Sequence, residues 1–240
     1  MDHFIKTDSY VCVDLETTGL NPKTDRIIEI GAVRVERGVQ TGTFETFVNP
    51  GRLLPEAIVG LTGIRDEQLS DAPDICEVLP ELLAFAEGEV LLGHSVLFDY
   101  SFLKKAAVNQ KKKFEKQGID TLKIARTFLP ELESRSLDFL CRHYEIPHRA
   151  HRALADARAT CALYEKLYEE FGEREEAAKL FAPKELIYHV KRDTPATPAQ
   201  KQRLYQLIDR HKLVVDYQVE MLTRSEASRC TDRILAEYGR

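Results

Sequence analysis

Hydrophobic and polar residues alternate along the first part of the chain. In the segment 10–16, valine and leucine alternate with more polar residues, and this period of two predicts a β-strand. A mostly apolar run at 27–35 predicts a second, central strand, and the segment 43–48 predicts a third, which ends at Asn49-Pro50-Gly51. Because short turns join the three segments, we expect them to form an antiparallel meander.

The spacing of apolar residues changes to a helical one after residue 73. Helices are predicted at 75–85, around 98–106 and around 122–128, with a short buried strand at 90–93 between the first two. An alanine-rich segment at 153–171 predicts one more long helix. Strands that alternate with helices after an initial meander predict an α/β domain, with a mixed central sheet flanked by helices.

The C-terminal part of the chain has a different character. Residues 173–196 are charged and broken by prolines, which is typical of a linker. Two capping boxes follow, Thr197-Pro198-Ala199-Gln200 and Thr223-Arg224-Ser225-Glu226, and each predicts the start of a helix. We therefore expect a main domain at 1–172, a linker at 173–196 and a small helical appendage at 197–240, to which the sequence assigns no role.

The composition is that of a soluble globular protein. The 240 residues are 43% hydrophobic and 30% charged, and the five cysteines are scattered without a C-x-x-C pair, as expected of free thiols in a reducing cytoplasm. The chain shows no signal-peptide pattern, and its apolar runs are too short to cross a bilayer, so we expect a cytoplasmic protein without a membrane partner. The net charge of −5, taken alone, argues against binding to nucleic acid.

Asp14 and Glu16 are the first residues that suggest a chemical role. Residues two apart on a strand project from the same face, roughly 7 Å apart, so the two carboxylates repel one another unless they share a cation or a proton. An exposed strand end with solvated charges is the alternative. Asp99 follows the buried strand at 90–93, where open α/β sheets place ligands, although an acid that stabilises a helix N-terminus explains it equally well.

His151 and Asp156 form the third candidate pair. Their separation by five positions corresponds to about 140° around a helix, so the two side chains cannot share one helix face. We therefore expect His151 in the loop after Pro147 and Asp156 in the first turns of the long helix. A histidine beside an acidic site titrates near neutral pH, but a histidine exposed in a basic loop fits the same pattern.

Taken together and in this order, the three motifs resemble a known family. Asp14-x-Glu16-Thr17-Thr18-Gly19, then Phe98-Asp99, then His151-x-x-x-x-Asp156 are similar to the DnaQ-like 3′→5′ exonucleases of the DEDDh subgroup, including the proofreading epsilon subunit of bacterial DNA polymerase III and stand-alone relatives. The resemblance covers about residues 9–170. It implies a ribonuclease H-like fold for the main domain.

The resemblance also implies a catalytic machinery. It assigns Asp14, Glu16, Asp99 and Asp156 to two divalent metal ions, and oxygen ligands without cysteine favour Mg²⁺ or Mn²⁺. His151 is then the general base that takes a proton from the attacking water. The product would be a nucleoside 5′-monophosphate.

Contacts with the substrate follow from the same resemblance and from charge. The family places a 3′-terminal nucleotide against Thr17, Thr18 and Leu20, and the basic loop before His151 suggests contacts with the substrate backbone. Further candidates are His94, which stands where many relatives have asparagine, together with Phe98, Arg149 and Arg152. Positive charge gathers at 104–126 and 142–152, so charge by position favours nucleic acid although net charge does not.

We therefore expect an exonuclease that acts on DNA 3′ ends, with single-stranded DNA as the preferred substrate, in proofreading or repair. A polymerase or another replication or repair protein is the expected protein partner. An exoribonuclease that trims RNA 3′ ends is the nearest alternative, because the same acids serve both substrates and only the 2′-OH distinguishes them. A non-catalytic nucleic-acid-binding module is a further alternative, against which the intact acids argue.

Overall fold

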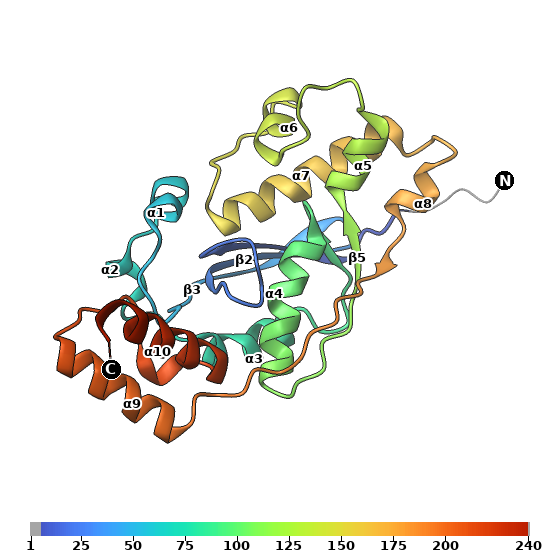
Figure 1. The fold of residues 1–240 in the computed structure, drawn as a ribbon. Helices are drawn as coiled ribbons and strands as arrows, with labels where there is room; N and C mark the ends of the chain where they lie inside the picture. Colours follow the sequence, from blue (N-terminus) through green and yellow to red (C-terminus); the bar gives the residue numbers. More distant parts are fainter. Residues whose placement is uncertain (1–5, 240) are drawn as a thin grey trace.

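The computed structural model describes residues 6–239, which form a six-stranded mixed sheet covered by helices on both faces (Figure 1). The strand order is β3-β2-β1-β4-β5-β6. The strands are β1 (Tyr10–Thr17), β2 (Ile27–Glu36), β3 (Val39–Phe47), β4 (Leu91–Gly93), β5 (Gln117–Asp120) and β6 (Lys184–Glu185). The first three strands form the predicted antiparallel meander, β4 and β5 run parallel to β1, and β6 is antiparallel to β5.

The helices lie between and beyond these strands. They are α1 (Glu56–Thr62), α2 (Asp66–Leu69), α3 (Ile75–Phe85), α4 (Val96–Asn109), α5 (Thr121–Phe128), α6 (Leu137–His143), α7 (Ala153–Phe171), α8 (Ala177–Phe181), α9 (Pro198–His211), the 3-10 helix η1 (Val219–Met221) and α10 (Arg224–Tyr238). No helix within residues 6–239 is long and apolar enough to span a membrane.

The alternation along β1 divides the core into two layers. Val11, Val13 and Leu15 pack with α3 and α4 on one face of the sheet. Tyr10 and Cys12 point to the other face, where α5, α6, α7 and α8 cover them. Because side chains on a strand alternate between faces, the next two residues of this second set also face α7. These two residues are Asp14 and Glu16.

Several elements have no strong signal in the sequence. Strand β5 is short and polar, and it contains Gly118, where a Cβ atom would lie 2.7 Å from a methyl carbon of Leu186. The segment predicted as a linker, 173–196, begins with α8 and β6, and the fully buried Phe181 belongs to the core beneath α7. Only the second half of that segment is free of helix and strand. The sequence therefore underestimates how far the main fold extends.

Residues 194–239, which we call the C-terminal unit, form a helical appendage with a core of its own. That core is built from α9, η1 and α10 and includes Leu204, Leu207 and Ala227. Both capping boxes predicted at its helix starts are present, with Thr197 and Thr223 as the N-cap residues. The outermost residues of the predicted domains, 1–5 and 240, lie outside the described part of the chain.

Candidate metal and 3′-end site

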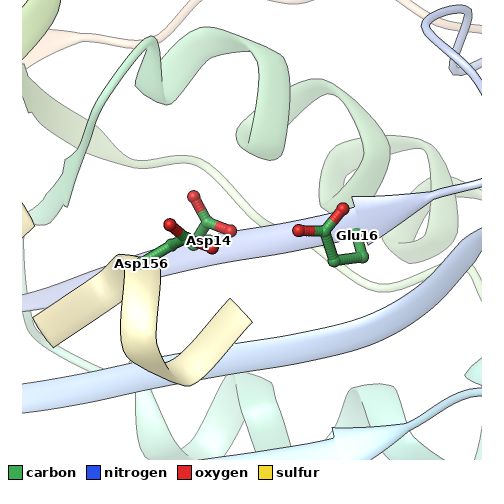
Figure 2. A group of neighbouring side chains, drawn as sticks. All are labelled: Asp14, Glu16 and Asp156. Atoms are coloured by element: carbon green, nitrogen blue, oxygen red, sulfur yellow. The ribbon is translucent and has the colours of Figure 1, made fainter. Parts of the chain in front are cut away.

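Three carboxylates from distant parts of the sequence meet at the end of β1. Asp14 and Glu16 lie on the face of β1 that α7 covers, and Asp156 reaches them from the first turn of α7 (Figure 2). One carboxylate oxygen from each of these residues lies within 4.8 Å of the others. The fold therefore brings together three of the four acids that the sequence predicts as metal ligands.

A glycine on β2 sets the position of α7. Gly31 pairs with Asp14 across the two strands, and a Cβ atom at Gly31 would lie 2.1 Å from both the carbonyl carbon of Ala153 and the amide nitrogen of Leu154. Only a residue without a side chain lets the start of the helix lie this close to the sheet. This close approach places Asp156, in the same first turn of α7, beside β1.

Glu29 attaches the start of α7 to the same strand. Its side chain is only 1% exposed, and it accepts hydrogen bonds from the guanidinium of Arg152 at 2.8 and 3.1 Å and from the N–H of Ala153 at 3.1 Å. A buried carboxylate is costly unless it is paired in this way. Glu29 lies in the segment 27–35 predicted as a strand, and no local pattern marks its pairing with Arg152, which is 123 positions away.

The carboxylate of Asp156 is held from two sides. Its Oδ1 atom lies 2.5 Å from Nε2 of His148, whose side chain is 4% exposed, and its Oδ2 atom accepts the backbone N–H of Arg152 at 2.9 Å. The other ring nitrogen of His148 lies 3.7 Å from a carboxylate oxygen of Asp138. His148 lies in the basic loop before His151, and nothing in the sequence marks its contact with Asp156.

Asp99, the fourth predicted ligand, lies outside the three-residue cluster. It is 4% exposed at the start of α4, and its Oδ1 atom accepts the backbone N–H of Leu15 at 3.1 Å. That bond ties α4 to the residue between Asp14 and Glu16. Asp99 therefore adjoins the cluster through β1.

The electrostatics of the cluster favour a bound cation. Burial, followed by repulsion from Asp99, Asp156 and Glu16, raises the pKa of Asp14 well above its usual range. Burial, with repulsion from Asp156 and Glu29, raises the pKa of Glu16 to about 7. Burial also raises the pKa of Asp99 well above normal. Because the donors of the cluster are all carboxylate oxygens, they fit a hard divalent cation.

His151 lies on the solvent side of the loop before α7. It is exposed, and its backbone adopts a left-handed conformation with φ at 64°. The loop position agrees with the expectation from spacing. Its role as a general base stays a prediction.

The turn between β1 and β2 carries the residues predicted to meet the 3′-terminal nucleotide. Thr17 donates its hydroxyl to the carbonyl of Gly19 at 2.6 Å, and the hydroxyl of Thr18 accepts the N–H of Arg26 at 3.0 Å. Leu20 is 85% exposed and projects from this turn. An apolar side chain held clear of the fold is available to a ligand.

The remaining predicted contacts differ in their surroundings. Both ring nitrogens of His94 bond within the protein, to the Thr121 hydroxyl at 2.9 Å and the Arg135 carbonyl at 2.8 Å, and burial lowers its pKa. Phe98 packs on Phe102, with ring centroids 5.1 Å apart. Arg149 is exposed and Arg152 pairs with Glu29, and the substrate contacts of all four residues stay predictions.

The basic segment 104–126 is less available to a ligand than its composition suggests. Lys104 and Lys105 are buried and pair with Glu115 and Asp193. Lys116 donates to backbone carbonyls, whereas Lys123, Arg126 and the run 111–113 are exposed. Positive charge in this segment therefore serves the fold more than the sequence indicates.

Comparison with known proteins agrees with this geometry. The family model RNase_T, described as exonuclease, matches residues 11–164, which contain the whole acidic cluster. The chain belongs to this exonuclease family. This is the family of the DnaQ-like 3′→5′ exonucleases, and the mixed sheet flanked by helices confirms the ribonuclease H-like fold expected for the main domain.

The relatives of the chain include bacterial DNA polymerase III proteins. The chain is 39% identical to the DNA polymerase III subunit epsilon of Aquifex aeolicus, over 68% of this chain and 81% of that protein. It is 34% identical to the PolC-type DNA polymerase III of Oceanobacillus iheyensis, over 98% of this chain. The chain spans only 17% of the length of that PolC-type relative.

Solved structures share the fold at lower identity. Exonuclease X in complex with 5′ overhanging duplex DNA has a TM-score of 0.58 and 24% identity, covering 72% of this chain and 99% of that one. The nuclease domain of 3′hExo, a DEDDh family member bound to rAMP, has a TM-score of 0.57 and 21% identity, covering 69% of this chain and 94% of that one.

Proposed function

We propose that this exonuclease depends on divalent metal ions and removes nucleoside 5′-monophosphates from the 3′ ends of DNA. The observation that carries the proposal is the meeting of Asp14, Glu16 and Asp156, whose oxygens lie within 4.8 Å of one another. Mutual repulsion and burial oppose this arrangement, and a cation removes both penalties. With Asp99 beside them, these residues would hold two ions, Mg²⁺ or Mn²⁺.

Two such ions, when bound, stabilise the charge on the attacking and leaving oxygens of an in-line displacement. The remaining chemistry falls to residues of the chain. The His151 imidazole accepts the proton of the attacking water as a general base. Because the bond between phosphorus and the 3′ oxygen breaks, the released nucleotide keeps a 5′ phosphate.

The turn after β1 would bind the end of the strand. Thr17 and Thr18 offer backbone groups beside the acids, and the exposed Leu20 would pack against the last base. Arg149, also exposed, would contact the phosphate backbone. These contacts are sequence-tolerant, as an enzyme that degrades any 3′ end requires.

DNA is the substrate that the relatives favour. The matches at 34% to 42% identity are named as DNA polymerase III proteins, so we propose a role in proofreading or repair alongside a DNA polymerase. One observation favours RNA as a second candidate, since 3′hExo shares the fold and is bound to rAMP. A non-catalytic binding module is less consistent with the molecule, because a scaffold gains nothing from a cluster of buried acids.

Matched DNA and RNA strands of the same sequence, each labelled at the 5′ end, test this proposal. We expect Mg²⁺ or Mn²⁺ to support shortening of single-stranded DNA at least about tenfold faster than RNA, which corresponds to about 1.4 kcal/mol in the barrier. EDTA should stop the reaction. Faster digestion of RNA than of DNA would identify RNA as the substrate. Absence of metal-dependent digestion of both strands would favour the non-catalytic binding module.

A further inference from the structure

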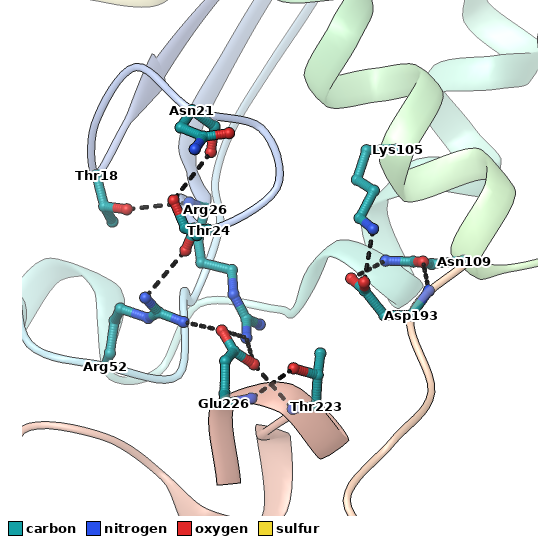
Figure 3. Close-up of polar contacts among 10 residues, drawn as sticks. All are labelled: Thr18, Asn21, Thr24, Arg26, Arg52, Lys105, Asn109, Asp193, Thr223 and Glu226. Carbon is teal, nitrogen blue, oxygen red and sulfur yellow. Dashed lines mark hydrogen bonds and ion pairs between the residues drawn. The ribbon is translucent and has the colours of Figure 1, made fainter. Parts of the chain in front are cut away.

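Glu226 connects the C-terminal unit to the main domain. It occupies the third position of α10, where one of its oxygens completes the capping box by accepting the N–H of Thr223 at 2.8 Å. The same carboxylate bonds to Arg26 at 3.1 Å and to Arg52 at 2.8 Å, and both arginines belong to the main domain (Figure 3). The side chain of Glu226 is only 11% exposed.

Both arginines contribute to the structure of the turn between β1 and β2, residues 18–26. Arg26 ends this turn, and its N–H and carbonyl pair with the hydroxyl and N–H of Thr18 at 3.0 and 2.8 Å. Arg52 donates its second guanidinium nitrogen to the carbonyl of Thr24 at 3.1 Å (Figure 3). Glu226 thus holds the turn at two points.

Side-chain packing is incomplete on the side of this turn that faces the C-terminal unit. A cavity of about 580 Å³ lies between the turn and the C-terminal unit, and Lys23, Ile27 and Met221 are among the residues that line it. Where atoms face a cavity, dispersion contacts that would fix a segment are missing. The polar bonds to Glu226 therefore stand on the side of the turn where packing is incomplete.

These bonds are strong ones. Although burial opposes it, Arg26 and the hydrogen bonds from Thr223 lower the pKa of Glu226 to about 2. Charge-assisted hydrogen bonds between guanidinium and carboxylate are about twice as strong as neutral ones, and their planar geometry restrains both partners. The carboxylate stays ionised over the whole pH range in which the enzyme would work.

We propose that Glu226 is a positioning residue for the substrate, and that the C-terminal unit acts through it to hold the turn that receives the 3′-terminal nucleotide. Leu20, which projects from this turn, is the side chain whose position depends on the link. The inference rests on the proposed function, because it takes the turn as the binding place of the strand end. The link through Glu226 thus gives the C-terminal unit a part in substrate binding.

The C-terminal unit has other attachments, so the link can be tested without detaching it. Segments 51–53 and 216–218 pair through backbone bonds, from Leu53 N–H to Asp216 at 2.7 Å and from Gln218 N–H to Gly51 at 2.8 Å. Asp193 adds bonds to Lys105 at 2.6 Å and to Asn109, just before the unit begins (Figure 3). These contacts do not involve Glu226.

The test uses steady-state digestion of 5′-labelled single-stranded DNA by the full chain in Mg²⁺. Glu226→Gln keeps an acceptor for Thr223 but loses the charge that binds both arginines, so KM should rise about tenfold while kcat changes less than about twofold. Arg26→Gln breaks the same link from the other side without touching the helix cap, and should give the same split. Glu226→Asp keeps the charge, so its KM for the DNA strand should lie between those of the wild type and Glu226→Gln.

Glu220→Gln is the matched control. Glu220 pairs with Lys201 and accepts the hydroxyl of Tyr205, all within the C-terminal unit, so its KM should equal that of the wild type. An active wild type whose KM is unchanged in both Glu226→Gln and Arg26→Gln would overturn the inference alone. A fall in kcat with unchanged KM would overturn it as well. A wild type that digests no strand would overturn the proposed function, and the inference with it.

Discussion

The Nε2 atom of His148 lies 2.5 Å from Oδ1 of Asp156, whereas His151, three residues later, is exposed. The two histidines of this loop therefore have different surroundings. His148 orients a carboxylate that would bind metal, and His151 is free to meet a substrate. Partners that orient a metal ligand typically change metal affinity by about 10–100-fold when they are removed.

His148→Phe should therefore weaken metal binding. The substituted ring fills a similar volume but cannot donate to Asp156, so we expect the Mg²⁺ concentration for half-maximal digestion to rise about 10–100-fold. The rate at saturating Mg²⁺ should change only a few-fold. His143→Phe, in an exposed position on α6, is the control. An unchanged metal dependence in His148→Phe would show that the contact has no role in metal binding.

His151→Ala should lower turnover and leave the Mg²⁺ dependence unchanged, which is the reverse of the effect expected for His148→Phe. Loss of a general base lowers turnover by about 10²–10⁴-fold, and the Mg²⁺ dependence should stay that of the wild type. A titration of activity against Mg²⁺ separates the two quantities. Equal losses in turnover and in metal affinity would identify His151 as a ligand.

Gly31→Ala should destabilise the fold and disrupt the site together. The added Cβ atom would lie 2.1 Å from backbone atoms of Ala153 and Leu154, and backbone cannot move aside as a flexible side chain does. We expect a loss of at least about 1–3 kcal/mol in the free energy of unfolding, measured in urea, and a large loss of activity as Asp156 shifts. Gly60→Ala is the matched control, since nothing lies within 4 Å of its added Cβ and a helix favours alanine. Equal stability of the two variants would contradict this account of α7.

The stability of the metal-free protein should depend on pH through Glu16. Its pKa is about 7 in the folded protein and 4.5 ordinarily, so the folded state binds the proton more tightly. The stability contributed by this protonation is present below about pH 4.5 and is lost as the pH rises through 7. Relative to Glu16→Gln, the wild type in EDTA should lose on the order of 3 kcal/mol over this range.

Urea unfolding of both proteins from pH 4 to 8 measures this difference. Addition of Mg²⁺ at pH 8 should recover stability in the wild type more than in Glu16→Gln, because the ion binds the ionised carboxylates. If the free energy of unfolding varied with pH in the same way for both proteins in EDTA, the pKa of Glu16 would not be raised in the folded protein.

Local patterns in the sequence predict local structure well here. The alternation over β1 predicts both the strand and the shared face of Asp14 and Glu16, and the two capping boxes predict the starts of α9 and α10. Each of these signals depends on residues that are close in sequence. The ribonuclease H-like fold and the enzyme family are implied by the resemblance of the three acidic motifs, taken in order, to a known family.

The contacts that complete the site could not be predicted in this way. Glu29 bonds to Arg152 across 123 positions, and Glu226 reaches Arg26 across 200, so nothing local marks either pair. Strand β5 and helix α8 are short, and their place in the fold comes from packing against larger elements. Such elements carry too few residues for a periodic pattern to distinguish them from loops.

The most direct test of the central claim is the product analysis of wild type and Asp14→Ala on 5′-labelled single-stranded DNA. With Mg²⁺, the wild type should shorten the strand one nucleotide at a time from the 3′ end and release nucleoside 5′-monophosphates, and EDTA should stop it. Asp14→Ala should keep the fold, as judged by circular dichroism, and release nothing. Retained activity in a clean preparation of Asp14→Ala, or release from the 5′ end, would contradict the assignment of this acidic cluster as the catalytic site.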